Sequence, residues 1–298
     1  MRKILWLCLA LMVLEIIGCK SKEEDNDKPT KSLPDITGTI YANTNYWGLF
    51  EFDVSSGKWI KKTAPVPEHL GPAVTFHDNK MYFSEHDSDK IEAHKVDIQV
   101  CSLDSNENPR TLTTVEALPL CLSVSNDGGK LAYTMFVELG RIGLFLLDLS
   151  NNEKKLIYDA NVISIFDTAW SSDDASLFIS VQNKIKKYSL KDGHQETVAN
   201  GQLIKVFDNN TIGYFLYDSK SKEYVFYKKD ILSDTEKEIL RTKPTILYAD
   251  WDPTEKFIIA NCLSKFLIIW DSETEEEYVL PKLKYRAHRV YWESKKVK

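Results

Sequence analysis

Three observations predict an all-β fold, a six-bladed β-propeller of four-stranded blades. Aromatic and β-branched residues fall in short runs separated by Asn, Asp, Gly and Ser, and no amphipathic helix of convincing length follows Thr37. Two kinds of hairpin alternate, and one pair of them spans roughly 40 to 50 residues, the period of a four-stranded blade. The two ends of this repeat are complementary, which predicts a closed ring.

The first kind of hairpin has a tight turn rich in Asp, Asn and Gly, residues that tolerate positive φ. It occurs five times, as "AVTFHDNKMYFS", "LSVSNDGGKLAYTM", "TAWSSDDASLFIS", "IKVFDNNTIGYFL" and "YADWDPTEKFIIAN". The second kind joins an apolar strand to a half-polar strand across a polar turn. It occurs six times, as "GLFEFDVSSGKWIKK", "IQVCSLDSNENPRTLT", "GLFLLDLSNNEKKLIY", "KIKKYSLKDGHQETV", "YVFYKKDILSDTEKEIL" and "FLIIWDSETEEEYVL".

The ends of the repeat explain the unequal counts. The segment "GTIYAN" (38–43) is a second strand without the strand that should precede it, and "YRAHRVYWES" (285–294) is a first strand without a successor. We therefore expect the C-terminal strand to join the first blade, which removes an open sheet edge. A β-sandwich of two stacked sheets is the alternative, and the regular spacing favours the propeller.

The turns "SNDGGKLAY", "AWSSDDASLFIS" and "DWDPTEKFIIA" resemble the "WSPDGxxIAF" repeat of TolB-like and WD40-like β-propellers, and the resemblance covers nearly all of residues 37–294. Only Asp127-Gly128 keeps the acid–glycine pair, and no copy has the Gly-His plus Trp-Asp signature of true WD40 repeats. The resemblance implies the propeller fold and says little about activity.

The N-terminus has the features of a cleaved leader. Met1-Arg2-Lys3 is basic, and the stretch from Ile4 to Ile17 is apolar apart from Glu15. A membrane-spanning helix needs about 20 apolar residues, so residues 1–18 are predicted to be a signal peptide rather than a permanent span.

The end of this leader, Ile16-Ile17-Gly18-Cys19, resembles the lipobox of bacterial lipoproteins, with Ile16 in place of the usual leucine. The resemblance implies that Cys19 becomes the first mature residue and carries diacylglycerol, usually with a third acyl chain such as palmitate. More than one acyl chain anchors a protein stably in a membrane. An ordinary secretory signal with a chance cysteine is the alternative.

Residues 19–36 are predicted to form a lipid-anchored, flexible tether, because "KSKEEDNDKPTKSLP" is polar, charged and interrupted by proline. Its segment 22–25 ("KEED") resembles the signal that sends lipoproteins of the Bacteroidota to the outer face of the outer membrane. A solvated acidic linker is the alternative. We expect a protein of the bacterial cell envelope that is anchored to the outer membrane, with the propeller occupying residues 37–298.

Composition excludes some partners and bonds. The formal charge of -6 without a basic block argues against a nucleic-acid partner. Cys8 lies in the leader, and the three cysteines at 101, 121 and 262 lie in apolar runs, where buried free thiols are expected. A disulfide between Cys101 and Cys121 is left open. We expect a monomer.

Motifs for catalysis are missing from the sequence. It contains no Gly-x-Ser-x-Gly and no phosphate-binding glycine loop, and its six histidines lack a His-x-x-x-His pair. The acidic segment "SEHDSDKIEAH" (84–94) could hold calcium if it folded back, but a solvated loop is the favoured interpretation. No catalytic residue, metal or cofactor is therefore assigned.

In a propeller, the loops that enter the first strands share one face with the loops that join second to third strands, and function usually lies there. Several large side chains fall in those loops, and Tyr, Trp and Arg among them are the residue types enriched among binding hot spots. They define the predicted ligand-binding face: Tyr46, Trp47, His69, His86, Arg141, Phe166, Tyr217 and Arg286, with Lys220 beside Tyr217.

The predicted membrane anchor, the predicted fold and the missing catalytic motifs together favour a lipid-anchored, non-enzymatic propeller that binds a protein or other envelope ligand through this face. The alternative is a lyase or lactonase that acts on carbohydrate or lactone substrates at the channel mouth. Such an enzyme requires several ionisable side chains to meet there. A third role, architectural within the envelope, is what the TolB-like resemblance suggests by analogy.

Overall fold

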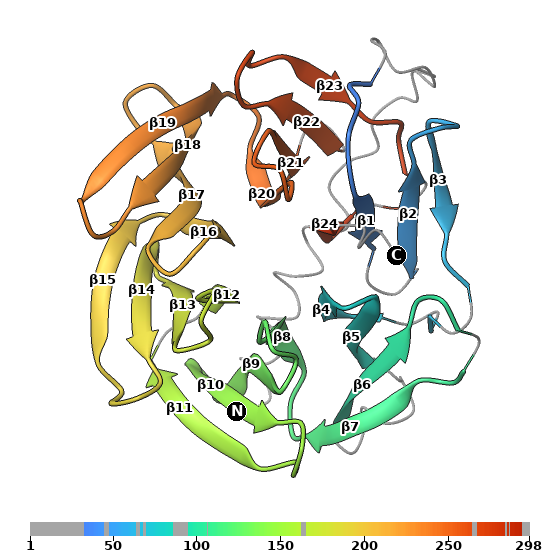
Figure 1. The fold of residues 1–298 in the computed structure, drawn as a ribbon, viewed down its shortest axis with the longest axis vertical. Coiled ribbons are helices and arrows are strands. Elements are labelled where there is room, and N and C mark those ends of the chain that lie inside the picture. The colour runs from blue at the N-terminus through green and yellow to red at the C-terminus, as the bar shows by residue number, and fades with distance from the viewer. Residues whose placement is uncertain are drawn as a thin grey trace.

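The computed structural model describes residues 33–44, 48–63, 66–67, 70–85, 95–105, 107–161, 165–263, 267–283, 285 and 287–293. These residues form 24 strands in six four-stranded antiparallel sheets, arranged in a ring (Figure 1). The all-β, six-bladed propeller predicted from the sequence is confirmed. The described part of the chain contains no helix that is long and apolar enough to cross a membrane.

Each blade is a meander of four neighbouring strands. Blades 1 to 3 contain, in order from the channel outward, β24 (Arg289–Glu293), β1 (Thr39–Asn43), β2 (Leu49–Asp53) and β3 (Lys58–Lys61); β4 (Leu70–His77), β5 (Lys80–Glu85), β6 (Val96–Ser102) and β7 (Arg110–Val115); β8 (Pro119–Val124), β9 (Lys130–Glu138), β10 (Arg141–Asp148) and β11 (Lys154–Ala160). Blades 4 to 6 contain β12 (Ile165–Trp170), β13 (Ser176–Val181), β14 (Lys184–Ser189) and β15 (Gln195–Asn200); β16 (Gln202–Val206), β17 (Thr211–Asp218), β18 (Glu223–Asp230) and β19 (Thr235–Thr242); β20 (Ile246–Trp251), β21 (Phe257–Cys262), β22 (Leu267–Asp271) and β23 (Glu277–Val279).

The C-terminal strand closes the ring, as expected. Strand β24 pairs antiparallel with β1, from Thr39 opposite Glu293 to Asn43 opposite Arg289. Blade 1 is therefore built from both ends of the described chain. Closure leaves every first strand at the channel and every fourth strand at the rim (Figure 1).

Six hydrophobic clusters hold the ring together, one at each interface between neighbouring blades. The middle strands supply most of this core, and β13 and β21 are buried at every position. Strands at the rim, such as β3 and β19, are mostly exposed. Packing of blade on blade, rather than one central core, therefore stabilises the molecule.

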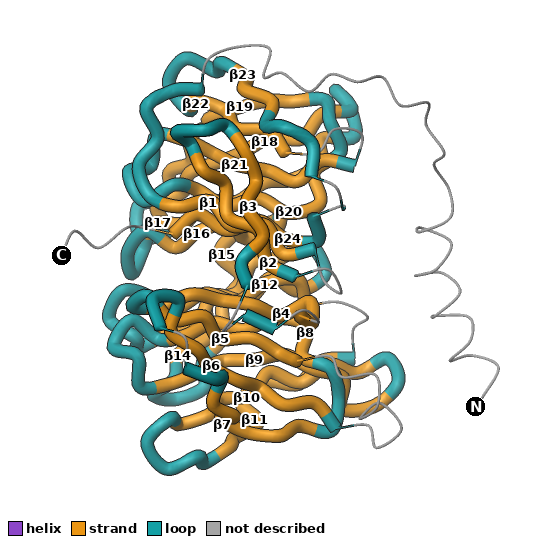
Figure 2. Tube along the Cα trace, turned by 90° about the vertical axis from the view of Figure 1, so that its right-hand side faces the viewer, coloured by secondary structure: helices purple, strands orange, loops and turns teal. Residues whose placement is uncertain are grey.

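The loops and turns collect on two opposite faces of the ring (Figure 2). We call the face that carries the entries to first strands and the connections between second and third strands the loop face. The opposite face, with the connections from first to second and from third to fourth strands, is the turn face. This division follows from the antiparallel order of strands within each blade.

Side chains of the repeated turns link neighbouring blades on the turn face. Asn126 of blade 3 donates its amide and backbone N–H to the Asp174 carboxylate of blade 4, at 2.7 and 2.8 Å. Blade 4 contacts blade 5 in the same way, because the Ser172 hydroxyl and the Asn209 side chain of blade 5 lie 2.8 Å apart. The recurrent Ser/Asn/Asp turns thus fix blade spacing as well as hairpin geometry.

The first described residues form a strap at the seam between blades 6 and 1. Leu33 and Ile36 pack against the hydrophobic cluster of that seam, and the Trp292 indole N–H donates to the Thr37 carbonyl at 2.7 Å. The strap runs inward from the rim to reach β1 (Figure 1, blue). The start of the described chain is therefore held beside the strand that closes the ring.

Candidate functional site

Two of the eight side chains predicted for the ligand-binding face lie among the described residues. Arg141 is the first residue of β10 and Tyr217 is the second-last residue of β17, so both sit at strand ends beside loops of the loop face. Phe166 lies in β12, and its side chain is not described. The others lie outside the described residues: Tyr46, Trp47, His69, His86 and Arg286, together with the lipid-anchor residue Cys19.

Arg141 is held within its own blade. Its Nε donates to both Asp159 oxygens at 2.7 and 2.8 Å, and a terminal nitrogen pairs with Glu138 at 2.8 Å. Hydrogen bonds to Asp159 and Glu138 raise the pKa of Arg141, and the bond to Arg141 lowers the pKa of Asp159. The guanidinium therefore braces the hairpin β9–β10 more than it offers a free charge to a ligand.

Tyr217 is open to solvent. Its side chain is 52% exposed, and its ring centroid lies 5.2 Å from that of Tyr224 on the paired strand β18. Two more apolar side chains stand out on the loop face, Leu139 at 69% and Leu263 at 57% exposure. All three flank connections between second and third strands, in blades 3, 5 and 6.

Large exposed apolar side chains are less frequent on the turn face. There Leu232 is 79% exposed and Val54 is 36% exposed, whereas Ile60 and Leu156 lie on the rim strands β3 and β11. Among the described residues, the exposed large apolar side chains thus include four at the loop face (Val137, Leu139, Tyr217 and Leu263) and two at the turn face.

The centre of the ring contains a buried cluster that sequence reasoning did not find. Arg289, the first residue of β24, has a side chain only 7% exposed, and its guanidinium lies 3.4 Å from Asp167 of β12. It also donates to the Leu120 carbonyl at 3.3 Å and stacks over the Tyr248 ring at 4.8 Å. One side chain of blade 1 thus contacts blades 3, 4 and 6 across the channel.

Burial alone would lower the pKa of Arg289, but the nearby Asp167 carboxylate raises it well above the ordinary value. The Cys121 thiol lies 3.3 Å from Asp167, and burial raises its pKa to about 11. Tyr291 completes the group, and burial raises the pKa of its phenol as well. The cluster therefore holds one ion pair among neutral groups, and its thiol is a poor nucleophile.

The cysteine pairing left open by the sequence is resolved. Cys101 and Cys121 are both free thiols and buried, so they form no disulfide with each other, and Cys262 is buried as well. Cys101 belongs to the hydrophobic cluster between blades 1 and 2, whereas Cys121 faces the channel cluster.

Deeper along the channel, Asp250 of β20 links blade 6 to the closing strand. Its carboxylate accepts the backbone N–H groups of Trp251 and Trp292, each at 2.7 Å, and Lys205 lies 3.6 Å away. Burial raises the pKa of Asp250, while Lys205 and the Trp292 N–H offset part of this rise. This carboxylate is a structural link across the seam.

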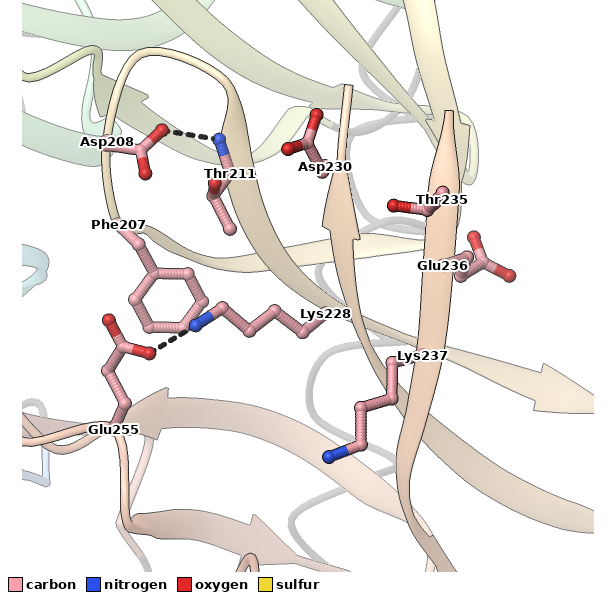
Figure 3. Close-up of a pocket in the computed structure, with 9 residues that line it drawn as sticks. All are labelled: Phe207, Asp208, Thr211, Lys228, Asp230, Thr235, Glu236, Lys237 and Glu255. Atoms are coloured by element: carbon pink, nitrogen blue, oxygen red, sulfur yellow. Dashed lines mark hydrogen bonds and ion pairs between the residues drawn. The ribbon is translucent and has the colours of Figure 1, made fainter. Parts of the chain in front are cut away.

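A pocket of about 390 Å³ lies between blades 5 and 6 near the turn face (Figure 3). Lys228 pairs with Glu255 across this interface, and its ammonium also lies 4.6 Å from the Phe207 ring centroid. Asp208 accepts the Thr211 N–H at 2.8 Å at the upper edge of the view. The Lys228 and Glu255 charges are thus paired with each other, and the rest of the pocket lining mixes polar and charged side chains.

Within the described residues, no group of three or more His, Cys, Asp and Glu side chains is placed to hold a metal ion. Most of the acidic segment 84–94 lies outside those residues.

No protein-family model matches the chain, and no curated protein matches it either. Among solved structures, TolB from Acinetobacter baumannii is similar with a TM-score of 0.65 and 16% identity, over 89% of this chain and 68% of that one. A chain of a nidogen/laminin complex gives a TM-score of 0.59 and 13% identity, over 85% and 97%.

An oligogalacturonate lyase from Vibrio parahaemolyticus is similar with a TM-score of 0.58 and 10% identity, over 89% of this chain and 84% of that one. Likeness at such identities concerns the fold alone. The chain has a TolB-like six-bladed propeller fold, which confirms the expectation drawn from the repeated turns.

Proposed function

We propose that this protein is a lipid-anchored, non-enzymatic binding protein of the bacterial cell envelope, which holds a protein or other envelope ligand at its loop face. The observation that carries the proposal is the group of exposed apolar side chains Leu139, Tyr217 and Leu263 on that face. Exposed apolar groups on a rigid scaffold mark interaction sites. The nidogen/laminin neighbour offers a precedent for a propeller-like chain within a protein complex.

The anchor part of the proposal depends on the sequence. The lipobox-like segment ending at Cys19 supplies the attachment, and residues 20–32 connect it to the strap. Mass spectrometry of the protein isolated from its native bacterium tests this step. The expected mature chain begins at Cys19 with a diacylglyceryl group, and an unprocessed chain with unmodified Cys19 would reject anchoring.

The binding part is tested by affinity capture from cells with the intact lipoprotein. Leu263→Asp changes the loop face, Trp47→Ala changes a position that the sequence predicts for it, and Leu232→Asp is the matched control on the turn face. We expect the loop-face variants to lose a partner that the control retains. Equal partner profiles in all variants would reject the loop face as the binding surface.

A second candidate is a lyase or lactonase that acts on carbohydrate or lactone substrates at the channel mouth. One observation favours it: Asp167, with a side chain 33% exposed, meets Arg289 in the channel beside Tyr248, whose ring lies 5.3 Å from that of His288. The oligogalacturonate lyases that are similar to this chain have the same fold. Against it, Arg289 is buried and already engaged by protein groups.

Turnover assays separate the two candidates. Purified protein is incubated with lactones and with uronate-containing oligosaccharides, beside Asp167→Asn. Turnover that disappears in Asp167→Asn, while the variant still unfolds cooperatively above the assay temperature, would establish the enzyme. We expect no turnover in either protein.

A further inference from the structure

We infer that the partner is a protein with an apolar, uncharged contact surface, and that two raised hairpins, β9–β10 and β17–β18, bind it. This inference rests on the proposed binding role of the loop face and names the part of that face that makes the contact. Four observations support it: the register of β9 and β17, the arginine ion pairs of the two hairpins, the exposed apolar side chains at the hairpin ends, and the balance of charge around them.

The two hairpins extend beyond their own first strands on the loop face. Strand β9 pairs with β8 as far as Met135 opposite Pro119, and residues 136–138 continue past that end. Strand β17 pairs with β16 as far as Phe215 opposite Gln202, and residues 216–218 continue. Three further residues in a strand add about 10 Å.

The described second strands of the other four blades lack such an extension. In each of them the second strand ends opposite the first residue of the first strand. These pairs are Asn43 with Arg289, Glu85 with Leu70, Val181 with Ile165, and Cys262 with Ile246. Among the strands described, blades 3 and 5 alone carry raised hairpins, with the lower hairpin of blade 4 between them.

An arginine braces each raised hairpin against the rim strand of its own blade. In blade 3, Arg141 binds Asp159 of β11 and Glu138 of β9. In blade 5, Arg241 of β19 lies 3.1 Å from Asp218, which ends β17, and 3.8 Å from Glu223, which begins β18. A braced hairpin loses little conformational freedom on binding, so more of the contact energy appears as affinity.

Both raised hairpins present apolar side chains at their ends. Leu139 forms the turn of the first with Gly140, whose φ of 79° suits a two-residue connection, and Val137 beside it is also exposed. Tyr217 lies near the end of the second and rests on Tyr224. Tyrosine and leucine side chains at raised, rigid positions provide apolar contact area.

The charges around these ends nearly cancel. Four cations and five anions leave one net negative charge, and most of them bind one another within the blade. The set comprises Arg141, Lys220, Lys222, Arg241, Glu138, Asp159, Asp218, Glu223 and Glu238. Such a surface does not attract an anionic membrane or a nucleic acid, and it favours a protein partner held by apolar burial.

Site-specific photo-crosslinking in the native envelope tests the inference. A benzophenone amino acid replaces Leu139, Tyr217, Leu263 or Leu232, one at a time, in the full-length protein. We expect adducts of one and the same polypeptide mass from positions 139 and 217, with equal yield at about 0.15 M and about 1 M salt, because apolar contacts are not screened. Leu139→Asp should reduce the adduct from position 217 about tenfold, while Leu232→Asp leaves it unchanged.

The outcomes separate this inference from the proposed function. Adducts at position 263 without adducts at 139 and 217 would overturn the raised-hairpin contact and leave the binding role of the loop face standing. A phospholipid adduct at 139, or a yield that collapses at high salt, would overturn the apolar protein partner. Adducts at 232 alone, or at none of the four positions, would overturn both. The melting temperature of Leu139→Asp shows that a lost adduct does not reflect unfolding.

Discussion

At the residue scale, the channel cluster shows how one side chain can connect distant parts of a ring. Arg289 contacts Asp167, Leu120 and Tyr248, residues from three blades, while it belongs to a fourth. A buried charge of this kind is tolerated because an opposite charge and a carbonyl compensate it. The cluster is therefore part of the framework that keeps the loop face in place.

We predict that removal of the anion is more harmful than removal of the cation. Asp167→Ala leaves Arg289 charged and buried, so it should lower the free energy of unfolding by about 3–5 kcal/mol. Arg289→Met leaves the Asp167 carboxylate, which is partly exposed to water, so it should lower the free energy of unfolding by less than Asp167→Ala does. Urea unfolding of both variants and of the double variant measures this, with Glu51→Gln of the partly exposed Lys62–Glu51 pair as control. Equal losses in the two single variants would contradict it.

Asp250 gives a pH-dependent prediction. Burial raises its pKa in the folded state above the ordinary value of about 3.9. Between those two values the folded state binds a proton that the unfolded state has lost, so this group's contribution to stability falls as pH rises above about 4.

Asp250→Asn removes that contribution and leaves the other acids unchanged. The unfolding free energy of the wild type, minus that of Asp250→Asn, should decrease from about pH 4 upward. Urea unfolding at a series of pH values provides the difference. A difference that is constant or grows with pH would show that Asp250 is not disfavoured as an anion.

At the element scale, close packing between blades depends on positions without a side chain. A Cβ atom on Gly213 of β17 would lie 2.7 Å from the ring of Trp251, which is fully buried between blades 5 and 6. The indole cannot retreat, because its N–H donates to the Glu255 carbonyl at 3.0 Å. The contact between β17 and the next blade therefore requires glycine.

Gly213→Ala should lower the free energy of unfolding by about 1–3 kcal/mol through overpacking. The matched control is Gly129→Ala, where a Cβ would lie 3.2 Å from the carboxylate of Asp127, an exposed side chain rather than a buried ring. Thermal unfolding of both variants measures the difference. A Gly213→Ala protein as stable as the control would show that Trp251 has room to shift.

Elements of this protein were predictable where local chemistry defines them. The turns around Asp127, Asp173 and Asp252 were recognisable because each aspartate accepts backbone N–H groups inside its own turn. The raised hairpins were not predictable, because their height depends on where β9 and β17 end relative to β8 and β16. That relation is a register between strands and leaves no local pattern.

The same distinction applies to the sites. Arg141 and Tyr217 were found because they flank hairpin connections, whose position follows from the repeat. The cluster around Arg289 was missed because its members lie up to 169 residues apart. The signal available in the sequence was a charged residue within the otherwise apolar first strands, in "FDTAW", "YADW" and "HRVYW".

At the scale of the whole molecule, ring closure depends on a strand that is joined to blade 1 by noncovalent contacts. Strand β24 pairs with β1 and donates the Trp292 backbone N–H to Asp250 of blade 6, and the Trp292 side chain is buried in the core of the seam. Without β24 the edge of β1 and the cluster of the seam would be exposed to water.

A chain that ends at residue 283 should therefore lose cooperative unfolding and associate into large particles. The control chain ends at Glu293, the last residue of β24. Size-exclusion chromatography and thermal unfolding compare the two. A monomeric, cooperatively unfolding product from the shorter chain would show that the five remaining blades and the open first blade hold the ring without closure.

The position of the strap has a mechanical consequence. A pull on the chain before the strap would reach the ring through Gly38 and enter β1, which β24 and β2 flank on both sides. Paired β-strands that are pulled along their axis are loaded in shear. Their hydrogen bonds then share the load instead of breaking one after another. The hydrogen bond from the Trp292 indole to the Thr37 carbonyl holds the chain just before the first residue pair of β1 and β24. The seam that closes the ring is thus also the place where the molecule carries tension.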